Sequence, residues 1–239
     1  MQYEQEIQDA TTAITSFADS YTHNKGRKSN DQSESESTAF ISNVSYSLQL
    51  LRIKIHNNKS SKPLIQIPNL FHTLVALTRF KLGTLMNEQY DRQRFQIRFW
   101  SRECLWHIQF HGDEQVQYEL VKEGYGSVLS ISFSTAGGSG EEDDYEIYQG
   151  LRHISDFLEN LSEGNDDDFR QPIFPNLPQL ARISVEQVEE EGGNEELDVQ
   201  MTNKGKGQYN NISYEANTAK GMVLNFYIDL SNTRPFWYN

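Results

Sequence analysis

The sequence predicts an α+β fold: N-terminal helices, a four-stranded antiparallel meander, one helix, and then a C-terminal antiparallel set of strands. Two observations predict it. Up to about residue 90, apolar residues recur every three or four positions, which is typical of amphipathic helices. From residue 91 to residue 134, apolar and polar residues alternate instead, which is typical of strands with one buried face.

Three helices are expected before the sheet. The second takes Ser37 or Thr38 as its N-cap, and Pro68 is expected as the first residue of the third. Residues 23–38 contain no apolar side chain, so they predict a mobile linker. The three apolar stripes are Ile7, Ala10, Ile14, Phe17 and Tyr21; then Ile41, Val44, Leu48, Leu51 and Ile55; then Phe71, Leu74, Val75, Leu82, Leu85 and Met86.

Four strands are expected over residues 94–100, 105–111, 115–120 and 129–134. Pairing the first two about a turn at Arg102 and Glu103 places Phe99 beside Trp106 and buries the aromatic side chains on one face.

The C-terminal half is expected to begin with a helix that Asp143 or Asp144 caps and Gly164 ends. Residues 171–178 contain three prolines and predict irregular structure. Residues 182–190 fit a helix or a strand, and strands are expected around residues 197–201, 212–214 and 224–230. The expected domains are an N-terminal helical segment over residues 1–62 and a core domain over residues 63–239, with a single domain left open.

The chain carries a formal net charge of −13, but the acidity is concentrated in one segment. Residues 141–198, called the acidic block below, contain 18 acidic residues against three arginines, whereas the rest of the chain is close to neutral. A solvated face explains such a block, and so does a docking surface for a basic protein partner.

The polar face of the expected sheet carries the candidate binding residues. This face could recognise a carboxylate or phosphate through arginine and stack a base on tryptophan. His107 oriented by Glu119 could act in acid–base catalysis. Three alternatives assign this face no function: it is an ordinary solvent-facing surface, a second buried face under a helix, or a surface that the acidic block covers. The candidate residues are Arg94, Arg98, Trp100, His107, His111 and Glu119.

No metal site and no cofactor are expected. Phosphate-loop, dinucleotide, nucleophile-elbow and Cys-x-x-Cys motifs are absent from the sequence. Cys104, His107 and His111 are three potential zinc ligands, but on a strand Cys104 points to the opposite face from the two histidines.

The leading hypothesis is therefore a non-enzymatic interaction or assembly protein of an intracellular complex or viral particle. It would contact a basic protein through the acidic block and the aromatic C-terminus around Phe236, Trp237 and Tyr238. One alternative is a single-stranded nucleic-acid binder that uses the basic and aromatic face of the sheet. The other is a small hydrolase or transferase that uses His107 and Glu119. No run of apolar residues is long enough to span a membrane, the N-terminus carries no secretory signal, and a single cysteine excludes internal disulfides.

Overall fold

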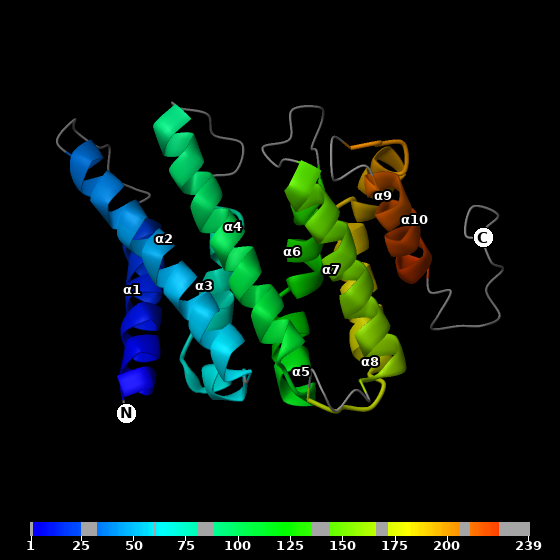
Figure 1. The fold of residues 1–239 in the computed structure, drawn as a ribbon, viewed down its shortest axis with the longest axis horizontal. Helices are drawn as coiled ribbons and strands as arrows, with labels where there is room; N and C mark the ends of the chain where they lie inside the picture. The colour runs from blue at the N-terminus through cyan, green and yellow to red at the C-terminus, as the bar shows by residue number, and fades with distance from the viewer. Residues whose placement is uncertain are drawn as a thin grey trace. The chain divides into compact units, whose positions relative to one another are not determined.

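The structure is a computed structural model that describes residues 2–24, 33–59, 61–80, 88–134, 144–165, 172–205 and 211–224. These residues form ten α-helices and one short 3-10 helix (Figure 1). They contain no strand, and one isolated bridge pairs Asn165 with Phe174. The fold is therefore all-α, and the predicted α+β class with its antiparallel meander is wrong.

The helices follow one another along the chain. They are α1 (Gln2–Asn24), α2 (Ser33–Asn58), the 3-10 helix η1 (Lys62–Gln66), α3 (Leu70–Leu77), α4 (Glu88–Phe110), α5 (Glu114–Lys122), α6 (Tyr125–Ser132), α7 (Asp144–Glu163), α8 (Pro178–Glu190), α9 (Gly193–Gln200) and α10 (Ile212–Val223).

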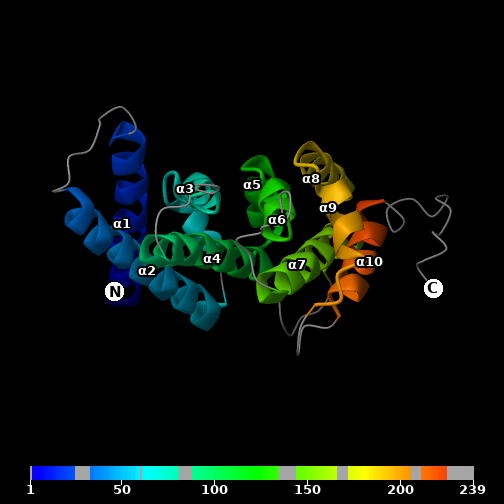
Figure 2. The same ribbon diagram turned by 90° about the horizontal axis from the view of Figure 1, so that it is seen from above.

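The chain divides into two compact units, Met1–Glu119 and Leu120–Asn239, which we call the N-terminal and the C-terminal unit. In the N-terminal unit, α2 packs along α4, α1 packs on α2 and α3, and α3 packs on α4 (Figure 2). The core of this unit consists of apolar side chains that are at most 8% exposed: Ala10, Ile14, Phe17, Ile41, Val44, Leu48, Leu51, Ile55, Leu64, Leu70, Phe71, Leu74, Leu77, Phe80, Ile97, Leu105, Ile108 and Val116.

Helices α2 and α4 run in the same direction (Figure 1). Near their first residues, the Gln93 amide donates to Ser42 Oγ at 3.3 Å. Further along, the Cys104 thiol donates to the carbonyl of Leu48 at 3.2 Å. These contacts bring the ends of the two helices to the same side of the unit, and this places the site described below.

In the C-terminal unit, α6 packs against α7 and α8, while α10 packs against α7 and α9. Gly126 permits the close approach of α6 to α8, because a Cβ at this position would lie 2.7 Å from the carbonyl oxygen of Ser184. The Gln187 side chain holds the same junction: its amide donates to the carbonyl of Val121 at 2.7 Å, and its oxygen accepts from the N–H of Gly126 at 3.0 Å.

Residues of the first two predicted strands form a single helix, α4. The sequence pattern did not predict this helix because most of its buried side chains are polar. The buried positions recur at helical spacing, but most of them carry charged or polar side chains that a search for apolar periodicity skips. Arg102 and Glu103, the proposed turn, are good helix formers that lie within α4. These buried positions are Arg94, Ile97, Arg98, Ser101, Cys104, Leu105, His107, Ile108 and Gln109.

Most described residues of the other predicted strands also lie in helices. Residues 115–120 lie in α5, and residues 129–132 lie in α6, where Ser130 and Ser132 are buried together with Leu129. Residues 197–200 lie in α9, and residues 212–214 lie in α10. Apolar alternation was therefore misleading, because short helices that are buried on several sides also alternate locally. Residues 225–230 lie outside the described residues.

The expected N-terminal helices are confirmed with different ends, and the helix after residue 143 is confirmed with the expected ends. Helices α1 and α2 take up both ends of the predicted linker, whose central residues 25–32 are not described. Helix α3 begins at Leu70 rather than Pro68 and ends at Leu77. The predicted extension is wrong for residues 78–80, which form a turn, and the rest of it up to Met86 falls on residues that are not described. Gly164 ends α7 at φ +83°, as expected. No described helix combines the length and the apolar character that a membrane crossing requires.

Candidate metal centre

The six residues predicted to share a sheet face lie on two helices and have different surroundings. Arg94 and Arg98 are buried: Arg94 Nη1 lies 3.4 Å from Asp91 Oδ1, and Arg98 Nη1 donates to the carbonyl of Phe80 at 3.3 Å. Trp100 is half-buried, with its ring edge-on to Phe99 at a centroid distance of 4.8 Å. Glu119 is half-buried on α5. The structure brings together only the remaining two, His107 and His111, at the end of α4.

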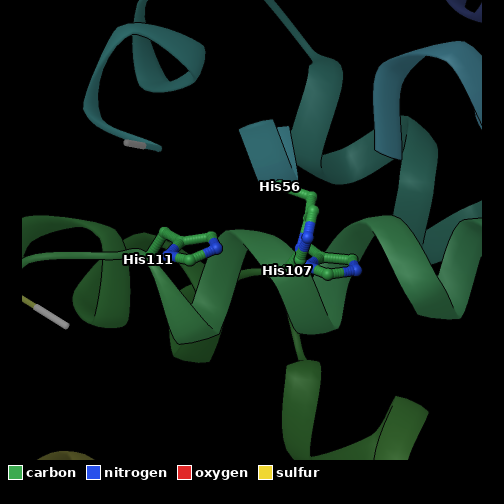
Figure 3. Close-up of side chains that lie close together, drawn as sticks. All are labelled: His56, His107 and His111. Atoms are coloured by element: carbon green, nitrogen blue, oxygen red, sulfur yellow. The ribbon is translucent and has the colours of Figure 1, made fainter. Parts of the chain in front are cut away.

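A third histidine joins this pair from another helix. His56, in the last turn of α2, points toward the two histidines of α4 (Figure 3). Ligand nitrogens of the three rings all lie within 4.8 Å of one another. The ring centroids of His56 and His107 are 5.1 Å apart, and those of His56 and His111 are 6.4 Å apart. We call His56, His107 and His111 the histidine cluster.

The backbone of α4 fixes the spacing of His107 and His111. The N–H of His111 donates to the carbonyl of His107 at 3.1 Å, so the two side chains stand one helical turn apart on the same side. The Gln117 amide then caps the end of α4 by donating to the carbonyls of Gln109 at 2.8 Å and Gly112 at 3.0 Å. Both histidines therefore project from a helix end that a buried glutamine holds in place.

The turn after His111 requires glycine at position 112. A Cβ there would lie 2.7 Å from Val116 Cβ and 2.8 Å from the carbonyl oxygen of Ile108. The turn continues into Asp113, whose carboxylate accepts from the N–H of Val116 at 3.2 Å and so caps α5. The same carboxylate pairs with Lys62 of η1 at 3.0 Å.

The position of His56 follows from the packing of α2 on α4. Leu48, Leu51 and Ile55 are buried, and this stripe holds the last turns of α2 against the other helices of the unit. Helix α2 then ends at Asn58, and the next residue, Lys59, adopts a left-handed conformation at φ +49° and donates its N–H to the carbonyl of Ile55 at 3.0 Å. His56 itself is exposed, whereas His107 and His111 are 2% and 5% exposed.

The buried imidazoles lack polar partners in the described part of the chain. Neither ring nitrogen of His107 and neither ring nitrogen of His111 makes a hydrogen bond there. Leaving a buried polar group without a partner costs about 1–3 kcal/mol, and such groups are uncommon in native proteins. The cluster therefore presents uncompensated nitrogen lone pairs in a confined space.

The surroundings of the cluster keep two of its rings neutral. Burial is the largest cause that lowers the pKa of His107 to about 3, and Arg52, His56 and His111 lower it further. Burial also lowers the pKa of His111, with His56 and Lys59 adding to the effect. A neutral imidazole carries the free lone pair that a metal ion needs, so these two rings are in the ligating form at neutral pH.

No model of a known protein family matches this chain, and no curated protein matches it either. The assignment of the site therefore depends on its geometry and chemistry alone. Three imidazoles are a donor set that zinc, copper, nickel and cobalt ions favour, whereas calcium and magnesium prefer oxygen ligands.

The cluster can hold such an ion if the three ligand nitrogens move slightly closer to one another. A tetrahedral ion with metal–nitrogen bonds of about 2.0–2.1 Å holds its ligand nitrogens about 3.4 Å apart. The three nitrogens lie within 4.8 Å of one another, and rotation of the exposed His56 side chain can bring them closer.

The expectation that this segment holds no metal ligands depended on strand geometry, and that geometry is wrong. On α4, Cys104 and His107 are three residues apart rather than on opposite faces. Cys104 still does not join the cluster: its thiol is buried, donates to the carbonyl of Leu48, and has a pKa that burial raises. The third histidine of the cluster is His56, which no local sequence pattern connects to residues 107–111.

Proposed function

We propose that the N-terminal unit binds a divalent transition-metal ion through His56, His107 and His111. One observation carries the proposal: three imidazole nitrogens from two helices lie within 4.8 Å of one another, and two of the rings are buried without a hydrogen-bond partner among the described residues. A bound ion would satisfy one nitrogen of each ring. It would also link the end of α2 to the end of α4, which makes a structural or regulatory use of the metal the simplest one.

The direct test is metal titration of the purified, metal-free chain. We expect Zn²⁺ and Co²⁺ to bind with a stoichiometry of one per chain in isothermal titration calorimetry, and Mg²⁺ and Ca²⁺ not to bind at this site. The variants His107→Gln and His111→Gln should each weaken zinc binding by at least tenfold. His72→Gln is the matched control, because His72 is an exposed histidine on α3. Equal zinc affinity in the wild type and both cluster variants would refute the proposal.

A second candidate function is binding of a basic protein partner through the acidic block. Helices α8 and α9 expose two large apolar side chains, Ile183 at 41% and Val199 at 53%, among exposed acidic residues. Mixed apolar and charged surfaces of this kind are common at protein interfaces. The exposed acidic residues are Glu186, Glu189, Glu190, Glu191, Glu195 and Asp198. The aromatic C-terminus, the other part of this hypothesis, lies outside the described residues.

Charge reversal tests this second function. A Glu189→Lys, Glu190→Lys, Glu195→Lys variant should lose a partner that co-purifies with the wild-type chain from its native source. A control with the same change of charge, Glu4→Lys, Asp9→Lys, Asp19→Lys on α1, should keep that partner. Retention of the same partner by both variants would exclude α8 and α9 as its contact. An intracellular location belongs to this proposal, because the one cysteine is free and buried.

The two alternative functions, single-stranded nucleic-acid binding and catalysis by a hydrolase or transferase, depended on the predicted sheet and receive no support from the helical structure. Nucleic-acid binding required Arg94 and Arg98 on an open face, and both are buried. Catalysis required His107 as a general base, but a pKa of about 3 makes this imidazole a weak base at neutral pH.

A further inference from the structure

We propose that a metal ion held by the histidine cluster keeps one coordination position open to solvent, and that a small monodentate anion, such as hydroxide, a carboxylate or azide, binds there. This inference rests on the metal binding proposed above and names the class of ligand that completes the site. It follows from the number of protein ligands, the exposure of the cluster, and the charges around it.

The protein supplies three ligands where a tetrahedral ion needs four. Among the described residues, the cluster contains histidines only. Two candidate ligands of other types on α4 are already engaged, since the Cys104 thiol donates to the carbonyl of Leu48 and Glu103 Oε2 lies 3.6 Å from Arg52 Nε. A closed structural site would need a fourth protein side chain, and the described residues do not place one within the cluster.

The side of the cluster at the end of α2 faces solvent. His107 and His111 are buried against the N-terminal unit, whereas His56 and the three residues after it, Asn57, Asn58 and Lys59, are all exposed. An ion bound by the three rings would have α4 behind it and the exposed end of α2 in front. A small ligand could therefore reach the ion from the side of α2.

The charges around the cluster favour an anion at that position. Three neutral imidazoles leave the full double positive charge on a divalent ion, because none of them contributes a negative charge. The positive side chains of Arg52 and Lys59 act on the cluster as well, from α2 and from the residue after it. A negatively charged fourth ligand reduces this concentration of positive charge, whereas a positively charged ligand increases it.

Cobalt substitution tests the inference with a spectroscopic signal. Co²⁺ bound to three imidazoles and one solvent ligand absorbs visible light, and exchange of the solvent ligand for azide changes the band positions and intensity. We expect the cobalt-loaded wild-type chain to show a saturable change when it is titrated with sodium azide. The variant Lys59→Gln should bind azide about twofold to fivefold more weakly, as expected for one exposed charge.

The matched control is Lys204→Gln, which removes an exposed lysine of the C-terminal unit and should leave the azide affinity unchanged. The outcomes separate the two proposals. Stoichiometric cobalt binding with a spectrum that azide does not change would overturn the open position and leave metal binding intact. Absence of cobalt binding would overturn both. Equal azide affinity in Lys59→Gln and the wild type would overturn the placement of the anion beside the end of α2.

Discussion

His107 and His111 stand one turn apart at the end of α4, with ring planes 15° apart and ring centroids separated by 6.1 Å. The hydrogen bond from the N–H of His111 to the carbonyl of His107, at 3.1 Å, fixes this relationship in the backbone. Two buried imidazoles in this arrangement are preorganised for one metal ion, and His56 needs only a side-chain adjustment to complete the set. The predictions below follow from this arrangement.

Zinc should stabilise the N-terminal unit. A ligand that binds only the folded state at 100 times its dissociation constant contributes about 2.7 kcal/mol, which corresponds to a rise in melting temperature of roughly 5–10 °C. Differential scanning calorimetry with and without Zn²⁺ measures the rise. His107→Gln should show almost none of it, whereas His72→Gln should show all of it. A full zinc-dependent rise in His107→Gln would place the metal elsewhere.

Acid should destabilise the metal-free chain through His107. The pKa of His107 is about 3 in the folded chain, against about 6.5 when the chain is unfolded. Between these values the unfolded state binds the extra proton, so stability falls as the pH drops from about 6.5 toward 3. With solvent screening taken into account, the loss from pH 7.5 to pH 5 is roughly 1 kcal/mol.

Urea unfolding of the wild type and His107→Gln at these two pH values isolates this effect. The pKa of Glu103 is raised by burial, so Glu103 acts in the opposite direction and favours the folded state as the pH falls. Because Glu103 is present in both chains, its contribution cancels in the comparison. The wild type should lose more stability than His107→Gln between pH 7.5 and pH 5, and equal losses would show that His107 is not buried in its neutral form.

The end of α4 should depend on Gln117. The variant Gln117→Met keeps the approximate size of the side chain but removes both hydrogen bonds to the carbonyls of Gln109 and Gly112. We expect a loss of about 1–3 kcal/mol in urea unfolding and weaker zinc binding. Gln115→Met, at an exposed position on the same helix, should change neither quantity. Similar behaviour of the two variants would contradict the role of Gln117 in positioning the site.

The C-terminal unit should depend on a glycine contact between α6 and α7. A Cβ at Gly150 would lie 3.1 Å from both the Cβ and the carbonyl carbon of Ser132, and it would collide with Ser132 Oγ. Gly150→Ala should therefore reduce the stability of this unit by about 1–3 kcal/mol in urea unfolding, although alanine is the better helix former. An increase in stability would show that α6 and α7 do not approach so closely.

The helices with apolar stripes could be predicted from sequence, and α4 could not. The stripe of α2 consists of Ile41, Val44, Leu48, Leu51 and Ile55, so its periodicity is visible without structural information. In α4, the buried positions include Arg94, Arg98, Ser101 and His107, while Phe95 and Phe99 are only half-buried. The local alternation of apolar residues therefore indicated strands, although the absence of glycine and proline between residues 88 and 111 favours one long helix.

The candidate site was visible in the sequence only in part. His107 and His111 stand four residues apart, a spacing that places two side chains on one side of a helix. The apolar alternation around them predicts a strand instead, so this helical spacing is not recognised from the sequence. His56 lies 51 residues before His107, and only the packing of α2 on α4 brings the two together. The low pKa of His107 likewise follows from burial in the folded unit, which no sequence pattern reports.

X-ray absorption spectroscopy of the zinc-loaded chain tests the central claim most directly. The histidine cluster predicts three imidazole nitrogens at about 2.0–2.1 Å from zinc, one oxygen ligand from solvent at a similar distance, and no sulfur ligand. Loss of imidazole scattering in His56→Gln would confirm the ligand that comes from α2. A zinc–sulfur distance of about 2.3 Å, or a first shell of oxygen atoms without imidazole, would contradict the account.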